Sequence, residues 1–180
     1  MPIQDLWNQD SLVWHFGLLD GGPAIGSDHD VEAPQVWVRA LEAVARDLRC
    51  LRYGRDVRLD GSGWELAVNG DYAVTIGWQG VRGISGFARC DGLSMDAPFD
   101  EAAVWVADTV QSDLAGYDFV QWPSQGQHML LPRKRDDGPV WIDTHTDDTV
   151  AAIGVLCQHI GRWGKTQVRE SLRDRLTLIE

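Results

Sequence analysis

The sequence is poor in lysine and in long apolar runs. It has two lysines against 14 arginines, and 27 acids against 16 bases give a net charge of −11. Such acidity disfavours nucleic acid and anionic membranes as partners and favours a basic protein. No stretch approaches the ~20 apolar residues that span a bilayer, and the first ten residues lack the basic and apolar regions of a signal peptide. We therefore expect a cytoplasmic protein with a protein partner, no nucleic acid and no membrane.

Cysteine is also scarce. Cys50, Cys90 and Cys157 are an odd number, and no CxxC pair occurs among them. This pattern is typical of free, buried thiols in a reducing compartment rather than of a disulfide framework or a zinc site.

Motifs for nucleophilic or phosphate chemistry are missing. The sequence contains no GxSxG, and the GKT at 164–166 lacks the first glycine of a phosphate loop because position 159 is histidine. We expect no enzyme activity, no catalytic residue and no cofactor. One alternative stays open, a metal-dependent hydrolase built from Asp28, His29, Asp143 and His145. Helix capping by the clusters at 28–30 and 143–148 explains the same residues without a metal.

The apolar patterns predict helices at both ends of the chain and strands between them. We expect helices over 4–19, 34–49, 98–117, 146–163 and 165–180, and strands within 56–90 and 118–143. Strands that cluster instead of alternating with helices indicate an α+β fold. The prediction is one α+β domain over 1–180, whose antiparallel sheet of about six or seven strands packs against helices at both ends of the chain.

A glycine run stands out within the strands, at Gly77, Gly80, Gly83 and Gly86. Its spacing is not GxGxxG, and strand-like sequence lies on both sides, so the pattern disfavours a nucleotide-binding loop. We expect a hairpin turn at Gln79-Gly80 flanked by positions without side chains. The bare patch is then either packed inside the protein or presented to a partner.

Charge and aromatic content suggest where a partner binds. Residues 91–124 contain seven acids and no base, and the chain has nine tryptophans, most of which we expect in the core. The candidate partner-binding residues combine the hairpin with acids of this stretch: Gly77, Trp78, Gln79, Gly80, Arg82, Asp96, Asp100, Asp108 and Asp113.

A family resemblance lies in the chain's length, its acidity and the strand-then-helix order of GWQGVRGISG and the later DTHTDDTVAAIGVLCQHIGRW. In these features the chain resembles the immunity proteins of bacterial polymorphic toxins, among them those that block NAD-hydrolysing toxins. The resemblance implies an antitoxin-like protein that neutralises a toxin enzyme by occluding its active site, with a basic toxin domain as partner. A second possibility is a secretion chaperone. A homodimer would favour the chaperone and a monomer the immunity protein, and the sequence leaves the two states undecided.

Overall fold

The computed structural model describes residues 11–18, 30–50, 59, 61–81, 83–89, 92–125 and 128–159. Within these ranges the chain forms two helices of more than three turns and two four-stranded sheets. In chain order the elements are β1 (Leu12–Gly17), α1 (Gln35–Leu48), β2 (Gly63–Val68), β3 (Val74–Trp78), β4 (Phe87–Arg89), α2 (Phe99–Gly116), β5 (Ser124–Gln125), β6 (His128–Arg135), β7 (Gly138–Asp143) and β8 (Thr149–Ala152).

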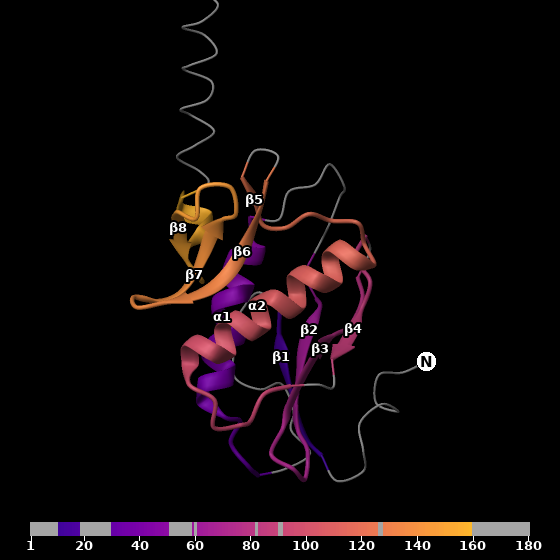
Figure 1. Cartoon of the computed structure of the whole chain (residues 1–180). Helices are drawn as coiled ribbons and strands as arrows, with labels where there is room; N and C mark the ends of the chain where they lie inside the picture. Colours follow the sequence, from indigo (N-terminus) through magenta and orange to yellow (C-terminus); the bar gives the residue numbers. More distant parts are fainter. Residues whose placement is uncertain are drawn as a thin grey trace, which may run out of the picture.

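The first sheet is an antiparallel meander in the order β1-β2-β3-β4. The register aligns Trp14 with Leu66 and Trp64 with Trp78, so one face of the sheet collects the large apolar side chains. Both helices lie against one side of this sheet (Figure 1). The chain turns between β2 and β3 at Asn69-Gly70, a residue pair that favours hairpin turns.

Both helices begin directly after a proline, Pro34 for α1 and Pro98 for α2. The apolar stripe of the predicted 34–49 helix is buried in α1, and Asp100 lies in the first turn of α2, where the helix dipole favours an acid. The helices pack against each other, and the rings of Trp37 and Trp105 meet edge to face with centroids 5.6 Å apart.

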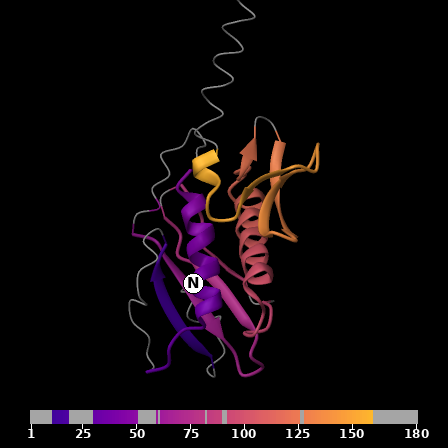
Figure 2. The ribbon, with the colours of Figure 1, turned by 90° about the vertical axis from the view of Figure 1, so that its left-hand side faces the viewer.

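The second sheet, β5-β6-β7-β8, lies on the other side of α2 from the first sheet (Figure 2). Gln111 ties α2 to the second sheet, since its buried Nε2 donates to the carbonyl oxygens of Trp122, just before β5, at 3.2 Å and of Leu130 in β6 at 2.5 Å. Trp122 and Trp141 stack edge to face at 5.4 Å. The largest side chains buried almost completely include six tryptophans, so these residues are core material as expected: Trp14, Trp37, Trp64, Trp78, Trp122 and Trp141.

The α+β class is confirmed, but the prediction of a single sheet is wrong. The later strands do not join the first sheet, because α2 separates the two strand groups and each covers a different side of the helix. Two predicted helices are also wrong where they are described: residues 12–17 of the 4–19 segment form β1, and residues 149–152 of the 146–163 segment form β8. A helix starts only at Leu156, and the predicted strand at 56–58 and helix at 165–180 lie outside the described residues.

Within the described ranges, no helix combines the length and the apolar character needed to cross a membrane.

Candidate functional site

Large apolar side chains are exposed at two places in the described part of the chain. Val31 and Tyr72, 51% and 64% exposed, lie near one end of β3, whereas Tyr117 and Phe119, 75% and 83% exposed, lie near the other. Two of these aromatics also have left-handed backbones, with φ of 60° at Tyr72 and 56° at Phe119. Such a conformation costs on the order of 1–3 kcal/mol at a residue that is not glycine, and strain of this kind concentrates at functional positions.

The hairpin between β3 and β4 does not turn at Gln79-Gly80 as predicted. Trp78 pairs with Phe87, and Val81 with Ile84, so the tip lies between Val81 and Ile84. The turn falls three residues later than the glycine spacing suggested, and it includes Gly83 with φ of 93°.

The same register explains the glycine run. A Cβ at Gly80 would lie 2.7 Å from the amide nitrogen of Gly86, and a Cβ at Gly86 would lie 2.6 Å from the nitrogen of Gly80. A Cβ at Gly77 would collide with the carbonyl oxygen of Phe87. The two strands approach too closely for side chains there, so the bare positions are filled by the hairpin's own backbone.

The hairpin is tied to the loop that follows α2. The Asp118 carboxylate accepts the amide of Ser85 at 2.9 Å, and the carbonyl of Ser85 accepts Trp78 Nε1 at 2.9 Å. Asp118 is itself almost buried, while its neighbours Tyr117 and Phe119 point outward. We call the resulting exposed patch the hairpin surface and define it by these residues: Gln79, Gly80, Ser85, Gly86, Tyr117 and Phe119.

Among the sequence-predicted partner residues of the hairpin, Gln79 and Gly80 are exposed and belong to this surface. Gly77 and Trp78 are buried, and the Trp78 ring packs on Phe87 in the core, so neither presents a side chain to a partner. Arg82 lies outside the described residues.

The four predicted acids are scattered rather than gathered. Asp108 is exposed in the middle of α2, and Asp96 is exposed in the loop before α2. Asp100 forms an ion pair with Lys134 at 3.0 Å, and Lys134 holds the pKa of this carboxyl below its usual value. Asp113 is half-buried near the hairpin surface.

Asp113 has a raised pKa. Burial raises its pKa from 3.8 to about 6; the positive charge of Arg89 opposes the shift, and the negative charge of Asp118 adds to it. The charge of Asp113, beside the hairpin surface, therefore changes near pH 6.

The second exposed place is a groove of about 720 Å³, which we call the acidic groove. Its walls are the first half of β1, the segment leading into α1, the β2–β3 turn and the loop before α2. Most of the lining is apolar and includes Val31 and Tyr72, while Glu32 and Asp96 are the only charged residues among the described ones that line it. Among the described lining residues, Asp96 is the one that the sequence predicted as a partner-binding residue. Tyr72 and Val31 were missed because nothing in the local sequence indicated that they are exposed.

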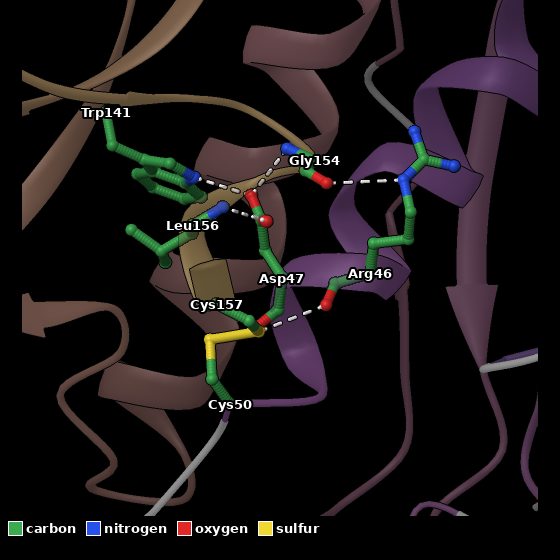
Figure 3. Close-up of a disulfide and its surroundings, with 7 residues drawn as sticks. All are labelled: Arg46, Asp47, Cys50, Trp141, Gly154, Leu156 and Cys157. Atoms are coloured by element: carbon green, nitrogen blue, oxygen red, sulfur yellow. Dashed lines mark hydrogen bonds between the residues drawn. A yellow bond between two sulfur atoms is a disulfide. The ribbon is translucent and has the colours of Figure 1, made fainter. Parts of the chain in front are cut away.

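A buried cluster joins the end of α1 to the segment after β8 (Figure 3). The Asp47 carboxylate is fully buried and accepts three hydrogen bonds, from Trp141 Nε1 at 2.7 Å, Gly154 N at 2.7 Å and Leu156 N at 2.8 Å. Burial raises the pKa of Asp47, and the three donors oppose that shift. Each buried donor has an acceptor, so the cluster is a structural tie rather than a reactive site.

Beside this cluster, Cys50 and Cys157 form a disulfide, with Cα atoms 5.3 Å apart and a sequence separation of 107 (Figure 3). The expectation of free thiols is wrong for these two residues. Sequence spacing gave no hint of the pairing because the partners meet only after β7 and β8 fold onto the end of α1. Cys90 lies outside the described residues.

Of the two carboxylates proposed for a metal site, Asp143 is described, and it has a hydrogen-bond partner within its own loop. Asp143 accepts the amide of His145 at 2.8 Å, and Asp147 pairs with Arg135 at 2.6 Å, in the loop before β8. No group of three or more potential ligands in the described ranges could hold a metal ion. Asp28 and His29 lie outside those ranges.

Comparisons with protein-family models, curated proteins and solved structures gave no match to this chain.

Proposed function

We propose that this chain is an immunity protein of the antitoxin type, which binds a cognate toxin enzyme through the hairpin surface and occludes its active site. The observation that carries the proposal is the pair of exposed aromatics, Tyr117 and Phe119, on a rigid support. Phe119 is 83% exposed and is held at φ of 56°, a conformation that a solvated loop would relax. Aromatic side chains of this kind are the anchors that dominate binding energy in protein interfaces.

The support beneath the aromatics is rigid for reasons visible in the contacts. Asp118 between them is fixed by its bond to Ser85, and Val120 donates to the carbonyl of Leu114 at 2.8 Å. The hairpin strands approach closely at Gly80 and Gly86, which leaves this part of the surface without bulky side chains. A preformed patch with two exposed aromatics loses little conformational entropy on binding.

The charge of the chain supports a basic partner. The stretch 91–124, which contributes α2 and both aromatics, has seven acids and no base. Such a field speeds association with a positively charged domain and disfavours nucleic acid and anionic membranes. The partner that we propose is a basic toxin domain, and no cofactor is required for binding.

The test uses the gene next to that of this chain, which should encode a secreted protein with a C-terminal toxin domain. The purified domain should lose its enzyme activity on addition of one equivalent of the chain. Phe119→Gly should weaken inhibition by about thirtyfold, the loss of one interface anchor worth about 2 kcal/mol, without unfolding the protein because glycine accepts a positive φ.

Tyr72→Gly is the matched control, since Tyr72 is also an exposed aromatic with positive φ but belongs to the acidic groove. It should inhibit as the intact chain does. An intact chain that leaves the domain active, or the absence of any such neighbouring gene, refutes the proposed function. Equal inhibition by Phe119→Gly refutes only the assignment to the hairpin surface.

A cytoplasmic location is part of this proposal, and the Cys50–Cys157 disulfide argues against it, because disulfides persist mainly in oxidising compartments. Alkylation of thiols in intact cells decides the matter. Rapid labelling of both residues places the chain in a reducing compartment, and protection of both places it in an oxidising one.

A further inference from the structure

We infer that the acidic groove is a second binding site, which takes a peptide segment combining an apolar side chain with adjacent lysine or arginine. The inference is independent of the proposed function, because the groove and the hairpin surface lie near opposite ends of β3 and share no residue.

The apolar part of the recognition comes from the walls. Val31 and Tyr72 are 51% and 64% exposed, although large apolar side chains elsewhere in the described ranges are mostly buried. Trp14 and Val68 form a buried floor beneath them. A groove of about 720 Å³ is within the range of ligand sites, and its open shape suits an extended chain more than a small molecule, which a pocket would enclose.

Tyr72 is held in place rather than left loose at the rim. Its amide donates to the carbonyl of Asn69 at 3.0 Å, and its carbonyl accepts the amide of Met95 at 2.7 Å. The Asn69 side chain accepts the amides of Asp71 and Ala73, which completes the turn. These bonds fix a tyrosine at φ of 60° with its ring in solvent. A preformed aromatic wall of this kind lowers the entropy cost of binding.

The basic part of the recognition comes from charge. Glu32 and Asp96 line the groove, Asp30 and Asp71 are exposed beside lining residues, and none of the four has an ion pair with a described residue. The described lining residues all come from segments of the chain without lysine or arginine, namely 1–38, 59–81 and 90–132. A ligand that supplies the cation complements this lining.

The same charge argument disfavours the chain's own first residues as the occupant. Residues 1–10 precede β1 and contain two aspartates and no basic side chain. An apolar segment of this composition would add negative charge to a groove that already holds two carboxylates.

The test pans a random peptide library, displayed on phage, against the intact chain. Enriched peptides should place lysine or arginine next to an apolar residue. Synthetic copies should bind in fluorescence anisotropy, more weakly at high salt because the charges are exposed. Tyr72→Gly should weaken binding by about thirtyfold, as expected for loss of an aromatic anchor. The double variant Glu32→Gln/Asp96→Asn should weaken it by up to about tenfold.

Two variants serve as matched controls. Phe119→Gly removes an exposed aromatic at positive φ, and Asp108→Asn removes an exposed acid, both away from the groove. Each should bind the peptides as the intact chain does. The inference is overturned if no peptide is enriched or if acidic peptides are enriched. It is also overturned if Tyr72→Gly and the double variant both bind the peptides as tightly as the intact chain does. The double variant retains Tyr72, so it tests the groove even if Tyr72→Gly does not fold.

Discussion

Replacing Asp47 with alanine removes the one acceptor shared by three buried donors, the indole of Trp141 and the amides of Gly154 and Leu156. Each buried donor left without a partner costs about 1–3 kcal/mol, and relief of the buried charge together with water entry offsets part of the sum. We expect Asp47→Ala to lower the free energy of unfolding by about 3–5 kcal/mol. With a urea m-value of about 2 kcal/mol/M, the midpoint falls by roughly 2 M.

Asp47→Asn refines the test, because the two oxygens have different partners. Oδ2 accepts from Trp141 and Gly154, whereas Oδ1 accepts from Leu156. An asparagine oxygen in the Oδ2 position keeps two bonds, and its amide group then faces the amide of Leu156. The expected loss is about 1–3 kcal/mol, smaller than for alanine.

The matched control is Asp108→Ala, which removes an exposed acid from the middle of α2 and should change stability by no more than about 0.5 kcal/mol. A loss for Asp47→Ala as small as that of the control would refute the reasoning. It would mean that the three donors find water as readily as they find the carboxylate.

Three further predictions concern stability. In Cys50→Ser/Cys157→Ser, loss of a crosslink spanning 107 residues should cost about 2–5 kcal/mol in urea denaturation, and a reductant should destabilise the native chain equally but leave the variant unchanged. Asp113→Asn should be more stable than the native chain by about 1 kcal/mol at pH 7, a value reduced for solvent screening, and equal to it near pH 4. The pKa of Asp113 is about 6 when folded and 3.8 ordinarily, so its ionisation costs stability above pH 6, and that cost disappears as pH falls through this window. Gly86→Ala should cost about 1–3 kcal/mol, because its Cβ would lie 2.6 Å from the nitrogen of Gly80.

Each of these has a result that counts against it. For the disulfide, it is a reductant effect that persists in the double serine variant. For Asp113, it is a stability difference that is the same at pH 4 and pH 7. For Gly86, the comparison is Gly116→Ala at the end of α2, where a Cβ meets nothing within 4 Å; equal effects at the two glycines would contradict the close approach of the hairpin strands.

Local patterns in the sequence determined the central elements of the fold. Proline followed by an apolar stripe indicated α1, and acids in the first turn with Gly116 at the end indicated α2. Asn69-Gly70 between alternating apolar residues indicated the turn from β2 to β3. These signals succeed because the residues that cause each element lie within a few positions of one another. The acidity of 91–124 was likewise readable directly, as was the lack of basic residues in the segments that form the groove.

The rest depended on contacts between residues distant in sequence. Residues 149–152 looked helical, yet they form β8 because pairing with β7 outweighs a weak local preference. The hairpin tip moved from Gln79 to the Val81–Ile84 turn because the register was set by Trp78 facing Phe87. The Cys50–Cys157 disulfide and the hydrogen bond from Trp141 to Asp47 form only where the second sheet packs against the helices.

The sequence by itself determined the α+β class, both helices, the first hairpin turn and the sign of the surface charge, since composition and short-range periodicity carry that information. Only the tertiary structure decided that there are two sheets rather than one, that Trp78 is core, and that Tyr72 and Phe119 are exposed on strained backbones. The physical reason is that burial belongs to the whole packing arrangement. A tyrosine in a turn and a tryptophan in a strand are both apolar in sequence, and the packing of the other elements decides which of them meets solvent.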